Sequence, residues 1–379
     1  MEKKDKNLNV PNLRFPEFSG EWESTPISTI ADIIGGGTPD TSVDEYWGGN
    51  IQWFTPSEIG KEKYAYLSDR TITEAGLINS SAKLLPQGTV LLSTRATIGE
   101  CSIATAECTT NQGFQSLVAK KNNVSSEFLY YIVAKIKREM LRRSCGSTFL
   151  EISANELKKI HANIPSKAEQ EKLVSLLSLI DQRIETQKKI IEKCESLIRG
   201  LYHSVFNNPS SILQLREVVS IIKGKQVNGE ELLEEGKYYV MNGGTEPSGY
   251  LDEYNTPANT ISISEGGNSC GYVQYNTEPF WSGGHCYSLH QKDEGVKYSY
   301  LYHFLKYKER DIMALRIGSG LPNVQKKDLE RFEVRVLPIE QQDRVAEILE
   351  DISAKCDLEK KILQEWQWQK SFLLSNLFI

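Results

Sequence analysis

The chain has 379 residues, of which 39% are hydrophobic and 25% are charged, and its formal net charge is −6. The acidic balance argues against a protein that holds nucleic acid by charge alone, because such proteins are usually basic. No apolar run approaches the roughly 20 residues of a membrane span, and the charged N-terminus lacks the apolar segment of a signal peptide.

The first part of the chain, residues 1–163, predicts a mixed α/β domain with short strands. Runs of β-branched and aromatic residues are bounded by glycine, proline or polar residues, which is typical of strands. The glycine run at 35–37 lacks the Lys-Ser/Thr of a nucleotide-binding loop and predicts a turn. We expect a helix or strand at 27–34, strands at 51–56, 88–94, 99–104 and 115–119, and a helix at 126–143.

Residues 164–207 predict one long amphipathic helix. Apolar residues recur at alternating steps of four and three, which is the heptad pattern of a coiled coil. Pro165 suits the first turn, and Asn207-Asn208-Pro209 ends the helix. The expected length is roughly 60 Å at about 1.5 Å per residue, which is too long for one small domain. The seam comprises Leu173, Leu177, Ile180, Ile184, Ile191, Cys194, Ile198, Leu201 and Val205.

The second half of the chain repeats the design of the first half. Leu177 and Leu349 occupy equivalent helical stripes 172 positions apart, and Gly146 and Gly318 open similar Gly-Ser segments at the same spacing. We therefore predict four segments: a first domain at 1–163, a central helix at 164–207, a second domain at 208–336 and a C-terminal helix at 337–379.

The spacing between the two copies is larger near the start of each domain. It is 188 positions from Ile33 to Ile221 and from Trp53 to Met241. The second domain is therefore expected to be about 16 residues shorter than the first, by the difference between 188 and 172. A helix at 300–315 is expected to match the helix at 126–143.

Recognition is favoured over catalysis by the absence of catalytic motifs. The chain has no Walker loop, no His-Glu-x-x-His and no Gly-x-Ser-x-Gly. Its Asn208-Pro209-Ser segment lacks the Asn-Pro-Pro-aromatic motif of an amino-methyltransferase. Seven cysteines show no metal-site spacing, so we expect reduced cysteines, no metal and a cytoplasmic location. We predict a non-catalytic protein whose polar loops form recognition surfaces.

The chain resembles the specificity subunit of type I restriction–modification systems along nearly its whole length. The resemblance is carried by Pro11-Asn-Leu-Arg-Phe-Pro-Glu-Phe with Trp22, the Ile51-Gln-Trp strand, the Gly-Ser-x-x-x-x-(Ile/Val) blocks at 146 and 318, and the helix starts Pro165…Glu169-Gln170 and Pro338…Gln341-Gln342.

The resemblance implies an α+β protein in which two target-recognition domains are separated by two long helices that form an antiparallel coiled coil. Each domain would read one half of a bipartite, asymmetric site in double-stranded DNA, and the helical spacer would set the gap. The resemblance also implies docking of two methyltransferase subunits and of restriction subunits. This chain would carry no cofactor, whereas S-adenosylmethionine would bind the methyltransferase partner, and ATP and Mg would bind the restriction partner.

Polar residues in loops that follow strands are the candidates for base reading. Arginine pairs with guanine, asparagine and glutamine pair with adenine, and glutamate accepts from cytosine. Such residues also commonly hydrogen-bond to their own loops, and that alternative stays open here. The candidates are Ser57, Thr94, Arg95, Asn111 and Gln112 in the first domain and Asn242, Thr245, Ser264, Glu265, Asn268 and His285 in the second.

Two further sets of residues suit phosphate contact and partner docking. Basic helix ends and the Gly-Ser blocks are the phosphate candidates, although a solvated basic face explains the cations equally simply. They are Lys137, Arg138, Arg142, Arg143, Ser147, Thr148, Lys308, Arg310, Arg316 and Ser319. Apolar residues outside the helical seams are the docking candidates: Leu176, Leu179, Ile190, Leu197, Tyr202, Ile348, Leu358, Ile362, Trp368 and Phe372.

A different class of function stays open beside DNA recognition. The chain could be a non-catalytic interaction scaffold, with two ligand-binding domains on a coiled-coil hinge. The acidic balance favours this alternative, whereas the duplicated polar loops and the family resemblance favour DNA recognition. Retention on a DNA resin at varied salt concentrations would separate the two.

Overall fold

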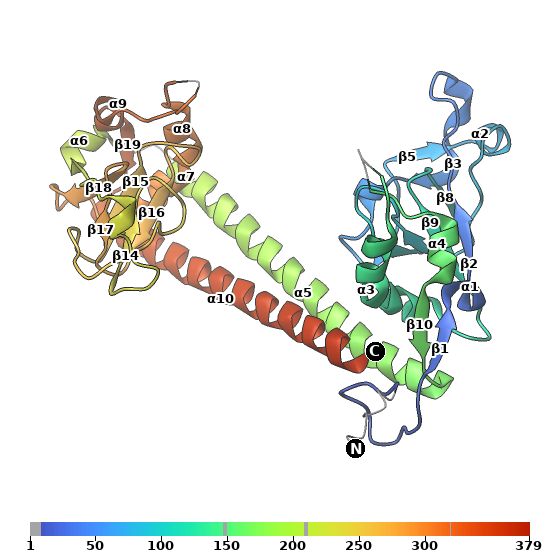
Figure 1. Cartoon of the computed structure of the whole chain (residues 1–379). Coiled ribbons are helices and arrows are strands. Elements are labelled where there is room, and N and C mark those ends of the chain that lie inside the picture. The colour runs from blue at the N-terminus through green and yellow to red at the C-terminus, as the bar shows by residue number, and fades with distance from the viewer. Residues whose placement is uncertain (1–8, 147–149, 208–210, 319) are drawn as a thin grey trace, which may run out of the picture. The chain divides into compact units, whose positions relative to one another are not determined.

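The computed structural model describes residues 9–146, 150–207, 211–318 and 320–379 (Figure 1). By internal packing the chain divides into two units, which are described separately below. The first unit comprises Met1–Gln187 with Ile362–Ile379, and the second comprises Lys188–Lys361. Each unit joins one mixed α/β domain to one end of both long helices.

Among the described residues, no helix is both long enough and apolar enough to cross a membrane.

The first unit has three sheets packed with short helices. A five-stranded sheet has the order β2-β9-β6-β7-β4, a three-stranded sheet has the order β5-β3-β8, and β1 pairs with β10. Its elements are β1 (Glu23–Pro26), α1 (Ile27–Ile30), β2 (Ala31–Gly35), β3 (Trp47–Phe54), β4 (Tyr64–Ala65), β5 (Arg70–Ile72), α2 (Glu74–Ile78), β6 (Val90–Leu92), β7 (Cys101–Ala104), β8 (Cys108–Thr110), β9 (Gln115–Ala119), α3 (Ser126–Arg143), α4 (Ala154–Lys159) and β10 (His161–Ile164), with short 3₁₀ turns at Asp44–Tyr46 and Pro56–Glu58.

Helix α3 spans the residues that the apolar spacing predicts. Ser125 caps it, because the Ser125 side chain accepts a hydrogen bond from the Phe128 backbone N–H. The apolar face, including Phe128 and Ile132, is buried against Val90 and Leu117 of the five-stranded sheet. This packing forms the core of the first domain.

The second unit has the same plan with fewer elements. Its sheets have the orders β12-β18-β15-β16 and β14-β13-β17, and β11 pairs with β19. The elements are β11 (Ser211–Gln214), α6 (Leu215–Val218), β12 (Val219–Lys223), β13 (Tyr238–Met241), β14 (Tyr250–Leu251), β15 (Thr260–Ser264), β16 (Val273–Asn276), β17 (Trp281–Ser282), β18 (Cys286–Gln291), α7 (Tyr298–Tyr307), α8 (Glu309–Ala314), α9 (Lys326–Glu330) and β19 (Glu333–Val336), with a 3₁₀ turn at Gly229–Glu231.

Strand pairing accounts for the shorter second domain. β2 pairs with β9 in the first unit as β12 pairs with β18 in the second, at the spacings of 188 and 172 found in the sequence. Between β3 and β6 the first unit has β4, β5 and α2, whereas between β13 and β15 the second has β14 alone. The additional residues of the first domain therefore form one local extension.

The predicted equivalence of Trp53 and Met241 is wrong. The Asn111 N–H donates to the Phe54 carbonyl, and the equivalent Gly283 N–H donates to the Met241 carbonyl. Met241 therefore corresponds to Phe54 rather than to Trp53. The sequence pattern is off by one residue because the true equivalence depends on the pairing of β3 with β8 and of β13 with β17, which the amino-acid pattern does not reveal.

The single helix expected at 300–315 is also wrong. The structure has α7 and α8, which are interrupted at Lys308. The Glu309 carboxylate accepts hydrogen bonds from the Val273 backbone N–H at 2.9 Å and from Lys306 Nζ at 2.6 Å. This tie to β16 fixes the start of α8 and accounts for the break.

The long helices are α5 (Lys167–Phe206) and α10 (Ile339–Leu377), and they pair antiparallel within each unit. In the first unit, Lys370 Nζ lies 2.7 Å from Asp181 Oδ1. In the second unit, Lys360 Nζ lies 3.0 Å from Glu195 Oε1. Most predicted seam positions are buried or half-buried, and Gln187, which the heptad pattern skips, is buried as well.

Candidate nucleic-acid interface

In the first unit, three loops meet at the ends of β3, β6 and β8. Thr94 donates to the Gly113 carbonyl from its backbone N–H at 2.9 Å and from its hydroxyl at 3.3 Å. The Gly113 N–H donates to Asn111 Oδ1 at 2.9 Å, and the Asn111 N–H donates to the Phe54 carbonyl. These bonds hold the loops together. The Gln112 Oε1 atom also accepts a hydrogen bond from the Thr38 hydroxyl, so the amide groups of Asn111 and Gln112 remain as donors at the surface.

These loops line an open hollow of about 240 Å³ that brings Arg95, Asn111 and Gln112 together beside Pro56. The Arg95 side chain is 46% exposed, and its Nε lies 3.9 Å from Glu151 Oε2. A guanidinium and two carboxamides in one hollow offer the donors and acceptors that base edges require.

The Arg95 loop has an unusual backbone conformation. Ala96 has a φ of 62°, which few residues other than glycine adopt. Ser93 supports this turn, because its Oγ donates to the Arg95 carbonyl at 3.1 Å and lies 2.9 Å from Thr97 Oγ1. The turn places Arg95 at the surface.

The other two candidates of this domain differ in exposure. Ser57 is exposed, and its Oγ lies 3.0 Å from Thr55 Oγ1 in a capped 3₁₀ turn. Thr94 is fully buried, and its hydroxyl is engaged by Gly113. In this conformation Thr94 holds the loops together and presents no surface to a base.

In the second unit, equivalent loops meet in the same way. The Glu265 N–H donates to the His285 carbonyl at 2.8 Å, as the Thr94 N–H does to Gly113. The Val324 N–H donates to the Glu265 carbonyl at 2.8 Å, as the Ile152 N–H does to Thr94 at 3.1 Å. Glu265 therefore occupies the place of Thr94.

Glu265 brings a carboxylate into this loop cluster. Its side chain is only 9% exposed, and Oε1 accepts hydrogen bonds from Lys223 Nζ and from the Tyr287 hydroxyl, both at 2.8 Å. Oε2 is buried without a hydrogen-bond partner among the described residues and lies 3.8 Å from His285 Nδ1. Burial, followed by the hydrogen bond to Glu265, raises the pKa of Tyr287 above its ordinary value.

The remaining candidates of the second domain surround Glu265 at different depths. Asn242 is half-buried and orients His285, because its Oδ1 accepts from the His285 N–H at 3.0 Å. Ser264 is buried and donates to the Gly243 carbonyl at 2.7 Å. Thr245, Asn268 and His285 are exposed.

Lys223 and Tyr287 belong to this cluster, although sequence reasoning missed them. They are direct cross-strand partners in β12 and β18, so both side chains lie on one face of the sheet beneath Glu265. The available signal was a lysine at the end of one apolar strand and a tyrosine at the start of another.

Four of the seven cationic phosphate candidates are paired with carboxylates. Lys137 lies 2.6 Å from Glu100, Arg142 and Arg143 both pair with Glu139, and Lys308 pairs with Asp311. Arg138, Arg310 and Arg316 are exposed, without an ion pair in the part of the chain that the structure describes. Ser147, Thr148 and Ser319 lie outside the described residues.

The docking candidates fall into exposed and enclosed groups. Tyr202 packs among Phe206, His303 and Tyr307, so its ring belongs to the core of the second unit. Leu176, Ile190 and Ile362 are half-buried. The exposed members are Leu179, Leu197, Ile348, Leu358, Trp368 and Phe372.

Two of the exposed helix faces have distinct shapes. On α10, the Trp368 ring, 66% exposed, stacks on Phe372 with centroids 5.8 Å apart. On α5, the equivalent positions 172 residues earlier are Ser196 and Gly200, which line a hollow of about 500 Å³ with Leu197. One face protrudes and the other is hollow.

A family model supports the identity of these domains. The model of the type I restriction modification DNA specificity domain matches residues 19–196 and 208–366.

No group of three or more His, Cys, Asp or Glu side chains suited to a metal occurs among the residues that the structure describes.

Similar proteins cover most of the chain. The MjaIX specificity subunit of a type I restriction enzyme from Methanocaldococcus jannaschii is 29% identical over 363 residues, which cover 84% of this chain and 83% of that protein. The EcoprrI specificity subunit from Escherichia coli is 23% identical and covers 87% of both. The fold matches the crystal structure of a type I restriction–modification S subunit from M. genitalium with a TM-score of 0.71, 22% identity and coverage of 98% and 99%.

Proposed function

The chain belongs to the type I restriction–modification DNA specificity family, and we propose that each of its domains reads one half of a bipartite, asymmetric site in double-stranded DNA. The loop clusters around Arg95 and Glu265 would contact the base edges. This chain would act without catalysis of its own. We expect a cytoplasmic location, because the target is DNA.

The observation that carries the proposal is the contrast between two loop clusters built on one backbone frame. Thr94 and Glu265 make matching backbone hydrogen bonds, yet the first loop presents the exposed Arg95, whereas the second carries the Glu265 carboxylate followed by Gly266. A palindromic site would require identical reading groups in both domains. Different polar groups on equivalent loops suit two different half-sites.

We propose that methyltransferase subunits dock on the exposed apolar residues of α5 and α10, and that restriction subunits join the assembly. Trp368 with Phe372 and the hollow at Gly200 are the strongest candidate contacts, because exposed aromatic pairs and small-residue hollows suit helix packing. S-adenosylmethionine would bind the methyltransferase partner, and ATP and Mg would bind the restriction partner.

We further propose that the paired helices set the number of unread base pairs between the half-sites. Inserting one heptad into both helices preserves the antiparallel pairing and the seam. The expected result is a longer gap with both half-sites unchanged. An unchanged gap would exclude this role for the helices.

The experiment that tests the proposal is co-expression of the chain with its partner methyltransferase, followed by genome-wide mapping of adenine methylation. We expect a split, asymmetric motif with one methylated adenine in each half. A stable complex that methylates no site would contradict DNA reading by the two domains and leave partner docking intact. Failure to form a complex would favour the interaction scaffold.

A further inference from the structure

In the first unit, an arginine bridges the two helices α3 and α4. Arg143 Nε donates to Glu139 Oε1 at 2.6 Å, and Arg143 Nη1 donates to Glu156 Oε2 at 3.3 Å. Glu139 also pairs with Arg142, and Glu156 pairs with Lys159. One guanidinium therefore joins a carboxylate on each of two helices.

The second unit keeps both carboxylates and lacks this arginine. Asp311 and Asp328 stand 172 positions after Glu139 and Glu156, and Leu315 stands in the place of Arg143. The register is supported by the bridges Cys145–Glu151 and Ile317–Asn323, which have the same spacing.

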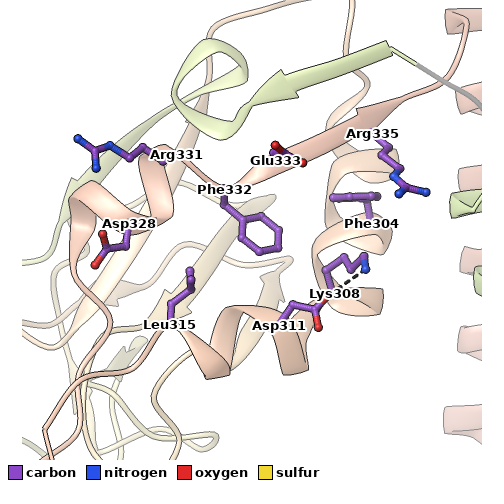
Figure 2. A pocket seen from close by; sticks show the side chains of 9 residues that line it. All are labelled: Phe304, Lys308, Asp311, Leu315, Asp328, Arg331, Phe332, Glu333 and Arg335. Carbon is purple, nitrogen blue, oxygen red and sulfur yellow. Dashed lines mark hydrogen bonds and ion pairs between the residues drawn. The ribbon is translucent and has the colours of Figure 1, made fainter.

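The corresponding place in the second unit, between α8 and α9, is an open hollow of about 460 Å³ (Figure 2). Figure 2 shows the Phe332 ring in this hollow, with Asp328 on one side and Asp311 on the other. Leu315 also lines it. The hollow therefore combines apolar side chains with three carboxylates (Asp311, Asp328 and Glu333) and three cations (Lys308, Arg331 and Arg335).

Of the three cations that line the hollow, only Lys308 forms an ion pair with one of its aspartates among the described residues, which leaves acceptor capacity at both aspartates. Lys308 Nζ lies 2.8 Å from Asp311 Oδ2, and Arg335 Nη1 donates to the Phe206 carbonyl at 3.1 Å. Asp328 has no ion pair within the described residues. Among the described residues, Glu139 forms ion pairs with two cations, whereas Asp311 forms an ion pair with one.

We propose that this hollow receives an arginine side chain from a protein partner, in the place that Arg143 fills in the first unit. The guanidinium would pair with Asp328 and share Asp311, and its methylene stem would lie on Phe332 and Leu315. A planar guanidinium can join two carboxylates and stack on an aromatic ring, whereas an ammonium group cannot do both in one geometry.

The position of the hollow suits a partner that docks on the long helices. Phe206, at the end of α5, stacks on Tyr307 and accepts the hydrogen bond from Arg335. The hollow therefore lies beside the end of α5. A partner that docks on this end of α5 would lie next to the hollow.

Titration with N-acetyl-arginine amide, followed by methyl NMR of the full chain, tests the site without DNA or methylation. We expect saturable shifts near Leu315 at millimolar concentration and at least tenfold weaker binding of N-acetyl-lysine amide. Asp328→Asn should weaken arginine binding at least tenfold. Leu315→Arg should abolish it, because the new side chain fills the hollow from within. Absence of a saturable shift, or equal binding by wild type and Asp328→Asn, would overturn the proposal.

The experiment also needs a matched control variant and a test of which protein supplies the arginine. Arg143→Leu removes the guanidinium that bridges Glu139 and Glu156 in the first unit. It should create a second arginine-binding site, with shifts near residue 143. In the complex with the co-expressed methyltransferase, the hollow should no longer bind the probe. If the hollow still binds the probe in that complex, the methyltransferase does not supply the arginine and the proposal is overturned, even if methylation proceeds normally.

Discussion

The two loop clusters share a backbone frame and differ in what they present. In the first unit the frame buries the neutral Thr94 and exposes Arg95. In the second it buries Glu265, which Lys223 and Tyr287 hold from below, and places Gly266 where Arg95 stands. The comparison teaches that the fold fixes where a reading group sits, whereas a few side chains decide its charge.

The same contrast extends to the helix behind each cluster and predicts a histidine-linked loss of stability at low pH in the second unit. Tyr131 donates to Asp181 in the first unit, and the equivalent residue in the second is His303, whose pKa is lowered to about 4 by burial. Between about 4 and its ordinary 6.5, the unfolded chain binds a proton that the folded chain does not. The second unit should therefore lose up to about 3 kcal/mol of stability as the pH falls through this window.

Hydrogen exchange of α7 at pH 7, 5.5 and 4.5 measures this loss. His303→Tyr restores the residue type of the first unit and should flatten the dependence on pH. The difference between wild type and variant isolates His303 from the carboxylates that titrate in the same range. If wild type and His303→Tyr lose the same stability as the pH falls, His303 is not the cause of the loss.

Arg95→Ala should damage recognition of one half-site and leave the other intact. Loss of a bidentate base contact costs about 2 kcal/mol of discrimination at one position. Binding of DNA variants by the complete complex measures this cost. Arg138→Ala is the matched control, because an exposed phosphate contact should weaken all sequences alike and reduce the salt dependence. If Arg95→Ala behaves like the control, Arg95 contacts phosphate.

Tyr287→Phe should destabilise the second unit by about 1–2 kcal/mol, because the buried Glu265 carboxylate loses one of its two donors. Gln115 occupies the corresponding strand position in the first unit, and Gln115→Leu should change stability by less than about 0.5 kcal/mol. Urea unfolding monitored for each unit by hydrogen exchange compares the two. A neutral Tyr287→Phe would show that Lys223 alone satisfies the carboxylate.

Gly200→Ala should raise the stability of the second unit by up to about 1 kcal/mol, since an added Cβ meets no atom within 4 Å. The same methyl group projects into the hollow on α5 and should weaken partner docking. Phe372→Ala, at the equivalent position of α10, should weaken docking with little change in stability. Thermal unfolding and pull-down of the methyltransferase measure the two effects, and a destabilised Gly200→Ala would contradict an open helix face.

Much of the fold could be predicted because its signals are local or periodic. Apolar spacing and the Ser125 cap determine α3, and the 172-residue repeat identifies the second domain and both long helices. The break at Lys308 could not be foreseen, because it depends on Glu309 reaching a backbone N–H in β16. The match of Met241 to Phe54 depends likewise on pairing between distant strands.

The candidate interface was predictable in place and less so in detail. The sequence places Arg95, Asn111 and Gln112 on loops after strands, and the structure brings them into one hollow. It could not show that Thr94 is buried or that Tyr202 belongs to the core, since burial depends on tertiary packing.

Methylation mapping of Arg95→Ala and Glu265→Ala beside wild type, each co-expressed with the methyltransferase, tests whether the two domains read their half-sites independently. We expect a split motif in wild type, relaxation of one half only in Arg95→Ala, and relaxation of the other half only in Glu265→Ala. A variant that alters both halves, or a wild-type motif that is continuous and palindromic, would contradict independent reading by the two domains.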